Sequence, residues 1–321
     1  MNVSHTASTK PLSVIVLGGG PDAEREVSLW SSEAIVKNLG TVPGYQPARF
    51  VIDTLTQAEL RAIPGDVIFP ALHGGWGEGG PLQDLLEADG RPFVGSMAGA
   101  ARTAMDKIAT KMIAATLGIP TKPAGILNTI DAHCPFPLPV VIKPTHDGSS
   151  VGLHICRTRE RFEQARQTIM AERSKHPARV YMVEDAVPQP RELTVGVLDG
   201  TAMAPIEIIV KPKVGGGEYA YEDKYLSDDT KYVVDPQLPA GVTKTIQRHA
   251  ETIVKAVGAR HLARVDFLLD PSGAAWMLEV NTLPGFTSHS LFPMAAQHAG
   301  FSFAALTARL VDMAIRDHST R

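Results

Sequence analysis

The segment LARVDFLLDPSGAAWMLEVNT, residues 262–282, constrains the fold of this 321-residue chain more than any other stretch. Two apolar runs flank Asp270-Pro271-Ser272-Gly273, whose residue types are typical of a type I turn, so the segment predicts a β-hairpin. If Asp270 pairs with Gly273, Arg264 lies opposite Glu279 and Asp266 lies opposite Met277. One face then carries Arg264, Asp266, Glu279 and Asn281. The other face is wholly apolar and carries Ala263, Val265, Phe267, Leu269, Ala274, Trp276, Leu278 and Val280.

A hairpin of this kind is expected to pack on a core through its apolar face and to present two carboxylates on the other. Cross-strand diagonal positions lie roughly 7–8 Å apart, so the side chains of Asp266 and Glu279 can converge on one cation. Two carboxylates and the Asn281 amide are oxygen ligands that suit Mg²⁺ or Mn²⁺. The alternative is a surface ion pair between Arg264 and Glu279 with Asp266 solvated, and the hairpin alone favours neither.

Composition excludes several classes of protein. The chain is 44% hydrophobic and 20% charged, which is typical of a globular protein with two or three domains, and its net charge of −3 gives no basic field for nucleic acid. Two cysteines, Cys134 and Cys156, lack metal-ligand spacing and indicate a reducing compartment. The apolar run 12–17 is too short for a signal peptide, and no run is long enough to cross a membrane. We therefore expect a cytoplasmic protein without a membrane partner.

The order of strand and helix patterns predicts an α/β protein whose first part is a Rossmann-like parallel-sheet domain. We expect three domains, over residues 1–97, 98–183 and 184–321. Strands are expected at 12–20 and 66–72 and within 137–156, helices at 23–40, 56–62, 98–117, 243–257 and 302–317, and a hairpin at Asp199-Gly200. The polar segment 211–233 is expected to be a long surface excursion, which is more often functional than idle.

Two glycine-rich stretches in the first domain end strands. GGGPDAEREVS lacks the G-x-G-x-x-G order, and Glu24 and Glu26 would oppose a pyrophosphate. These carboxylates suit an ammonium group or simply the first turn of a helix. HGGWGEGG, residues 73–80, is expected to be a loop after a strand, at the edge where ligands bind in open α/β sheets. A lone histidine is usually structural, and this location favours a functional role for His73 modestly.

Three further motifs lie in the middle of the chain. Lys143 ends the buried run VVIK before THDGSSVG, a loop that is not a Walker P-loop but has the amides and hydroxyls to cover phosphates. Lys107 lies on a helix, where most lysines are solvated. Glu184 and Glu192 flank a proline-interrupted bend that suits either an adenine and ribose site or a plain linker.

Taken in order, these motifs resemble the ATP-grasp superfamily and, more narrowly, the D-alanine–D-alanine ligase family. The resemblance covers nearly the whole chain after Lys10 and rests on AEREVSL, HGGWGEGG, MDK, VIKPTHDGSSVG, RELTVGVL, YEDKYLSDDT, RVDF and LEVNTLPGFTSHSL. It implies ATP-dependent joining of two D-alanine molecules through a D-alanyl phosphate, for peptidoglycan precursor synthesis. It also implies two Mg²⁺ or Mn²⁺ ions, and we expect a homodimer.

The resemblance implies a role for each matching residue. Lys107, Lys143, Ser150 and Lys224 would contact ATP phosphates, Glu184, Asp185 and Val187 the adenine, and Glu192 the ribose. Asp266, Glu279 and Asn281 would hold the metals. Glu24 and His73 would receive the first D-alanine, Arg264 and Gly285 the oxyanion, and Ser290 and Leu291 the second carboxylate. Ser149 and Tyr225 would join Glu24 in a hydrogen-bonded chain, and residues 211–233 would form a lid.

Two departures from the family pattern affect these roles. One extra residue separates Glu184 from Glu192, which puts the Val187 contact in doubt, and the segment before Tyr219 is longer. The rival readings are a sibling ligase that makes D-alanyl-D-lactate or D-alanyl-D-serine, and a catalytically silent ATP-binding regulator. Tyr225 favours the dipeptide product, and the retained metal ligands argue against the regulator. A nicotinamide oxidoreductase is least favoured, because its fingerprint is absent.

Overall fold

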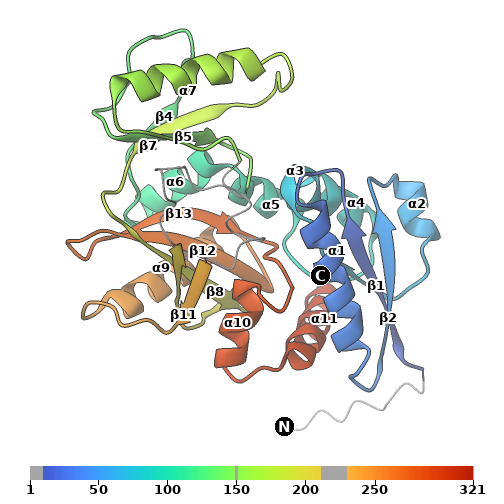
Figure 1. Ribbon diagram of the computed structural model, residues 1–321. Helices are drawn as coiled ribbons and strands as arrows, with labels where there is room; N and C mark the ends of the chain where they lie inside the picture. The colour runs from blue at the N-terminus through green and yellow to red at the C-terminus, as the bar shows by residue number, and fades with distance from the viewer. Residues whose placement is uncertain (1–9, 149–150, 211–229, 321) are drawn as a thin grey trace. The chain divides into compact units, whose positions relative to one another are not determined.

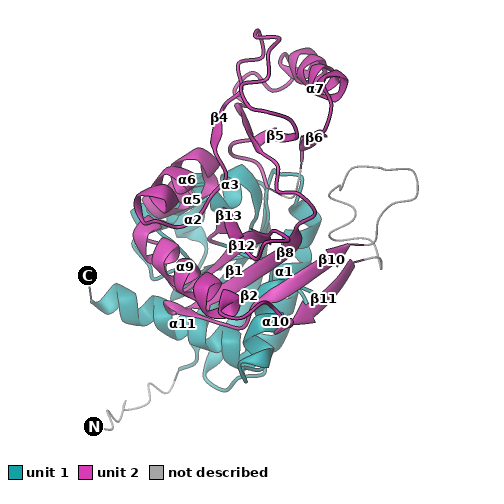
Figure 2. Ribbon diagram, turned by 90° about the vertical axis from the view of Figure 1, so that its left-hand side faces the viewer, with its two compact units in different colours: residues 1–98, 283–321 teal, residues 99–282 magenta. Residues whose placement is uncertain are grey.

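The computed structural model describes residues 10–148, 151–210 and 230–320. Its chain divides into two compact units, residues 1–98 with 283–321 (unit 1) and residues 99–282 (unit 2), which are coloured separately in Figure 2. Residues 283–321 group with the N-terminal part of the chain in this division, and the three expected ranges 1–97, 98–183 and 184–321 stay a prediction.

Unit 1 is built on a parallel sheet with strand order β2-β1-β3. Its strands are β1 (Leu12–Gly19), β2 (Tyr45–Ile52) and β3 (Val67–Pro70), and its helices are α1 (Arg25–Leu39), α2 (Gln57–Ala62), α3 (Gly74–Glu78), α4 (Pro81–Asp89), α10 (Leu291–His298) and α11 (Phe303–Ser319). Residues 14–17 of β1 are fully buried, as expected for a parallel strand with both faces covered. The predicted N-terminal parallel sheet is confirmed.

The C-terminal segment completes this unit. Helix α11 packs against α1 and β3, and in Figure 1 the blue α1 and red α11 lie side by side. Phe286 makes edge-to-face contacts with Phe69 of β3 and Phe303 of α11, with ring centroids 5.7 and 5.8 Å apart. An aromatic cluster therefore joins residues more than 200 positions apart in sequence.

Unit 2 begins with helices α5 (Ala98–Met105) and α6 (Lys107–Thr116) and an antiparallel sheet of order β4-β7-β5-β6. Its strands are β4 (Ala124–Ile126), β5 (Val140–Pro144), β6 (His154–Cys156) and β7 (Tyr181–Asp185). Helix α7 (Arg159–Glu172) covers one face of this sheet through Phe162, Ala165 and Ile169 (Figure 1). The single helix expected at 98–117 is wrong, because Asp106 leaves helical geometry and caps α6 by accepting bonds from the amides of Ile108 and Ala109.

The second sheet of unit 2 has the order β11-β10-β8-β12-β13, with β9 paired to β8. Its strands are β8 (Arg191–Leu198), β9 (Thr201–Ala202), β10 (Ile206–Val210), β11 (Thr230–Val234), β12 (Leu262–Leu269) and β13 (Ala275–Asn281). Helix α9 (Val242–Val257) packs on it through a stripe that includes Ile246, Ala250 and Ile253. The expected hairpin at Asp199-Gly200 is confirmed, since both residues have positive φ between β8 and β9.

The hairpin 262–282 differs from its expected register by one residue next to the turn and by two residues beyond a β-bulge. Arg264 pairs with Asn281 and Asp266 with Glu279, but Phe267 pairs with Met277, which leaves Leu278 as the extra residue of a β-bulge. The predicted pairs Arg264–Glu279 and Asp266–Met277 are therefore wrong. The core face carries Ala275 and Met277 in place of the expected Ala274, Trp276 and Leu278, which are all partly exposed.

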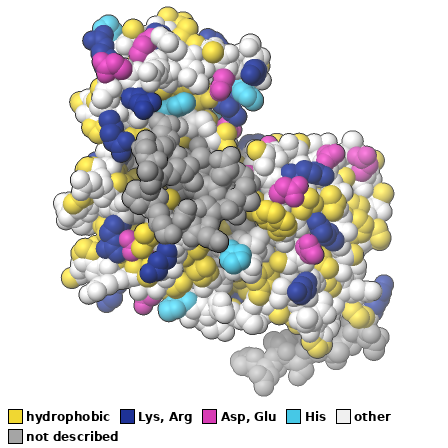
Figure 3. Space-filling model, in the orientation of Figure 1, with side chains coloured by type: hydrophobic (Ala, Val, Ile, Leu, Met, Phe, Trp, Pro, Cys, Tyr) yellow, Lys and Arg dark blue, Asp and Glu magenta, His cyan; other side chains and the backbone are white. Residues whose placement is uncertain are grey.

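Among the described residues, no helix is both long and apolar enough to cross a membrane. On the face drawn in Figure 3, basic and acidic side chains are interspersed among apolar and uncharged ones.

The stretch HGGWGEGG, expected to be a loop, forms the short helix α3 with His73 at its N-cap.

Candidate active site

The acidic pair of unit 2, Asp266 and Glu279, lies on the two strands of the hairpin, β12 and the edge strand β13. The β-bulge turns Glu279 toward the same face as Asp266 and places the two directly opposite each other, closer than the expected diagonal. Asn281 follows two residues later on the same strand. The residue types are those that the sequence predicts for a magnesium site, and the bulge brings the two carboxylates nearer together.

Asp266 is held in place by three hydrogen bonds. Thr194 of β8, which pairs with Asp266 across the sheet, donates its hydroxyl to Oδ1 at 2.6 Å. Arg264 donates from Nε to Oδ1 at 3.0 Å and from Nη2 to Oδ2 at 3.1 Å. The carboxylate is buried, so these donors replace the water that it loses. Thr194 was not singled out in the sequence, although its pairing with β12 is what aims it at Asp266.

Lys107 links the acidic pair to the loop THDGSSVG, residues 145–152, which we call the glycine loop. It begins α6 and is only 6% exposed, contrary to the expectation for a solvated helix lysine. Its ammonium lies 3.2 Å from Glu279 Oε2 and donates to the backbone carbonyl of Asp147 at 2.6 Å. A buried cation beside the backbone of a glycine-containing loop is suited to bind a phosphate.

A second charged cluster surrounds Glu184 at the end of β7. Lys143 lies 2.6 Å from Glu184 Oε1, and Lys111 of α6 lies 2.7 Å from Oε2. All three side chains are buried. Burial by itself raises the pKa of the Glu184 carboxyl, but the charges of Lys143 and Lys111 outweigh it and the net shift of that pKa is downward. The carboxylate is therefore ionised, and the cluster of two cations and one anion has a net positive charge.

The other expected nucleotide residues follow Glu184 along the chain. Asp185 ends β7 and donates its amide to the carbonyl of Pro123, while Val187 is buried in the bend that precedes β8. Gln189 has a positive φ of 42°, so the bend between Pro188 and Pro190 is tight. Glu192 lies in β8 opposite Ile208 and Leu268. The expected residues Ser149, Ser150, Lys224 and Tyr225, and most of the expected lid, lie outside the described residues.

Unit 1 holds the expected substrate residues other than Arg264, which lies in unit 2. Glu24 precedes α1 and His73 precedes α3, where it is buried. Gly285 packs so closely on Ser290 that an added Cβ would lie 3.0 Å from the serine oxygen. Ser290 Oγ accepts a bond from the Thr287 amide at 2.8 Å, and Leu291 then begins α10. The hydroxyl segment thus forms a tight turn at a helix start.

The donor set of unit 2 fits magnesium. Mg²⁺ is commonly bound by one or two protein carboxylates together with substrate phosphates and water. Asp266 and Glu279 can supply the two carboxylates. Within the described ranges, no group of three His, Cys, Asp or Glu side chains is arranged to hold a metal ion. The expected site has only two side chains of these types, Asp266 and Glu279, because its third ligand is the Asn281 amide.

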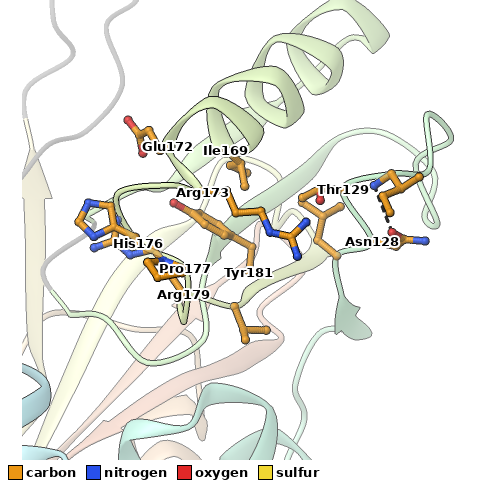
Figure 4. A pocket seen from close by; sticks show the side chains of 12 residues that line it. Asn128, Thr129, Ile169, Glu172, Arg173, His176, Pro177, Arg179 and Tyr181 are labelled. Atoms are coloured by element: carbon orange, nitrogen blue, oxygen red, sulfur yellow. Dashed lines mark hydrogen bonds between the residues drawn. The ribbon is translucent and has the colours of Figure 1, made fainter.

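A surface pocket lies elsewhere in unit 2, beside the end of α7 (Figure 4). Tyr181, Arg173 and Thr129 are among the side chains around it, and none of the expected site residues lines it. Arg179 lines the pocket and pairs with Asp147 at 2.8 Å. The pocket therefore adjoins the glycine loop through this ion pair and through Val180, whose carbonyl accepts hydrogen bonds from the amide and hydroxyl of Thr145.

Known proteins match nearly the whole chain. The family model described as "D-ala D-ala ligase C-terminus" matches residues 121–312. The D-alanine–D-alanine ligase of Methylacidiphilum infernorum is 36% identical over 305 residues, which cover 94% of this chain and 95% of that protein. The D-alanine–D-alanine ligase of Bordetella petrii is 38% identical over 309 residues, which cover 95% and 93%.

Solved structures agree with these sequence matches. The D-alanine–D-alanine ligase of Bacillus anthracis matches with a TM-score of 0.82 at 26% identity, covering 96% of this chain and 99% of that one. Its complex with ATP matches with a TM-score of 0.80 at 25% identity, with the same coverage. Fold and charged clusters together define an ATP-grasp ligase, as the sequence predicts. Within that class, the chain belongs to the D-alanine–D-alanine ligase family.

Proposed function

We infer that this protein joins two D-alanine molecules to D-alanyl-D-alanine with the conversion of ATP to ADP and phosphate. The observation that carries this inference is identity of 36–38% to D-alanine–D-alanine ligases over nearly the full length of both chains. The dipeptide serves peptidoglycan precursor synthesis.

The chemistry needs an activated carboxylate. An oxygen of the first D-alanine's carboxylate attacks the γ-phosphorus of ATP, ADP leaves, and a D-alanyl phosphate forms. The amine of the second D-alanine then attacks the carbonyl carbon, phosphate leaves, and the amine nitrogen loses a proton. Negative charge moves onto oxygen atoms in both steps, so preorganised cations and amides lower both barriers.

We propose that the charged residues of unit 2 hold the nucleotide. Lys107 and Lys143 would bind its phosphates, together with Ser150 and Lys224. Support comes from their positions: Lys107 begins α6 and donates to the Asp147 carbonyl of the glycine loop, and Lys143 lies in β5, the strand that leads into that loop. Glu184, Asp185 and Val187 would line the adenine site, and Glu192 would bind the ribose.

We propose that Asp266, Glu279 and Asn281 hold two Mg²⁺ ions, or Mn²⁺ in their place. When bound, these ions neutralise charge on the transferred phosphoryl group. Thr194 and Arg264 orient Asp266 for this role by their hydrogen bonds.

We propose that Glu24 binds the ammonium of the first D-alanine, with His73 near it, and that Ser149 and Tyr225 extend this contact. Arg264 and the Gly285 amide would stabilise the oxyanion. Ser290 and Leu291 would bind the carboxylate of the second D-alanine, supported by the tight turn that Ser290 closes before α10. We further propose that the protein is a cytoplasmic homodimer.

The test is to incubate the protein with ATP, Mg²⁺ and D-alanine, and to measure phosphate release and product mass. We expect stoichiometric ADP, phosphate and D-alanyl-D-alanine. Parallel reactions that also contain D-lactate or D-serine report depsipeptide or mixed dipeptide by mass. ATP binding without phosphate release in any of these reactions would contradict the ligase function and favour the silent regulator.

A further inference from the structure

Lys111 is a buried lysine to which neither the family pattern quoted above nor the proposed mechanism gives a role. It lies one helical turn after Lys107 on α6 and is 5% exposed. Its ammonium contacts Glu184 Oε2 at 2.7 Å, Thr121 Oγ1 at 2.7 Å and the Lys122 carbonyl at 3.5 Å. Its ammonium is therefore surrounded by three protein oxygens, one in an ion pair and two in hydrogen bonds, and it is taken up by protein contacts.

Lys143 is held differently. Within the described residues, its ammonium has a single partner, Glu184, at 2.6 Å. Among the described parts of the chain, two of its three donors therefore have no protein acceptor and can serve an anionic ligand. Glu184 thus contacts two lysines. Lys111, at Oε2, has further protein partners, whereas Lys143, at Oε1, has no other described partner.

Charge balance explains why two lysines surround one carboxylate. Lys143 and Glu184 alone would form a neutral pair with little attraction for phosphate. With Lys111 added, the buried cluster carries one net positive charge, and in a water-poor site such a charge acts strongly on an anion. We propose that Lys111 is a positioning residue that neutralises Glu184, so that the charge of Lys143 remains available to the phosphates of the nucleotide.

Lys111 also connects the cluster around Glu184 to β13, the strand that carries Glu279 and Asn281. Thr121, which accepts from Lys111, donates to the Met277 carbonyl at 3.1 Å, and the Met277 amide donates to the Pro120 carbonyl at 2.8 Å. Met277 lies beside the bulge that aims Glu279. A lysine at position 111 therefore serves both the charge and the placement of neighbouring elements, and a test must separate the two.

The experiment measures binding of three probes by calorimetry: ADP, inorganic tripolyphosphate and adenosine. This inference rests on the proposed role of Lys143 in nucleotide binding, but none of the probes requires D-alanine or turnover. We expect K111M to bind tripolyphosphate and ADP about tenfold or more weakly, since truncating one member of a buried charge group is costly. Adenosine binding should change less than threefold. K111R should retain most tripolyphosphate affinity, and K255M, at an exposed lysine on α9, should match the wild type.

Removing the carboxylate separates charge from structure. K111M/E184Q loses one charge of each sign, so it should bind tripolyphosphate more tightly than K111M. E184Q alone should bind it at least as tightly as the wild type, and this variant serves if K111M does not fold by circular dichroism. A double variant that binds tripolyphosphate more weakly than K111M, or a parallel loss of adenosine binding in K111M itself, would overturn the proposal. A wild type that binds neither ADP nor tripolyphosphate would contradict the proposed function itself.

Discussion

Replacing Thr194 with valine tests how Asp266 is held. The hydroxyl of Thr194 is 2.6 Å from Asp266 Oδ1, and the threonine is 1% exposed, so no water can take its place. Valine keeps the shape of the side chain and removes only the donor. Asp266 keeps its two bonds from Arg264.

The expected magnitude follows from these contacts. A hydrogen bond to a charged group contributes about 1.5–3 kcal/mol, and leaving a buried carboxylate under-satisfied costs a similar amount. Thr194→Ser keeps the hydroxyl and removes one methyl group, which costs about 0.8–1 kcal/mol. We therefore expect Thr194→Val to lower the free energy of unfolding by about 1.5–3 kcal/mol, more than Thr194→Ser does.

Urea unfolding of the three proteins, followed by circular dichroism, measures these differences. A second measurement is the Mg²⁺ concentration that gives half of the maximal ligase rate. Loss of a group that orients a metal ligand should raise this concentration about 10- to 100-fold in the valine variant and little in the serine variant. A valine variant at least as stable as the serine variant would refute the reasoning.

Three further changes have defined outcomes. Glu279→Gln should abolish Mg²⁺-dependent turnover with an unchanged circular dichroism spectrum, because only the polar face of its strand is altered; near-normal activity at saturating Mg²⁺ would refute the metal assignment. Hydrogen bonds from Ser272 and Trp276 lower the pKa of Asp270 from 3.8 to about 2. Its contribution to stability is present above pH 4 and lost as the pH falls toward 2, so the urea midpoints of wild type and Asp270→Asn should converge over that range. Gly18→Ala should destabilise the protein by about 1–3 kcal/mol in urea unfolding, because the added Cβ would lie 2.2 Å from Ser32 Oγ, whereas Gly99→Ala, in open space on α5, should not destabilise.

The hairpin shows how far sequence reasoning extends. Alternation in LARVDFLL and the Asp-Pro-Ser-Gly turn predict both strands and the polar face, and the structure confirms them. Alternation has a strict period of two, so it cannot indicate where one strand carries an extra residue. The bulge at Leu278 depends on packing Met277 into the core, which is a tertiary effect.

The cluster around Glu184 shows a different limit. Sequence reasoning selects Lys143 and Glu184, since each ends an apolar strand. Sequence reasoning does not select Lys111, although its spacing of four from Lys107 places both lysines on one face of a helix. Only the fold shows that this face is buried and that β7 brings Glu184 to it.

Unit 1 is interrupted in the sequence, and this affects how the chain folds as it is synthesised. Residues 1–98 leave the ribosome first, but Phe286 and α11, which cover β3 and α1, follow only after all of unit 2 has been made. At about 5–20 residues per second, the exposed sheet waits roughly ten seconds or more for them. Unit 2 is continuous, and its last residue is synthesised before residues 283–321 of unit 1. Unit 1 is therefore the first to begin synthesis and the last to complete its fold. A chain truncated after residue 282 and released from the ribosome should therefore have a protease-resistant unit 2 and a protease-sensitive N-terminal part.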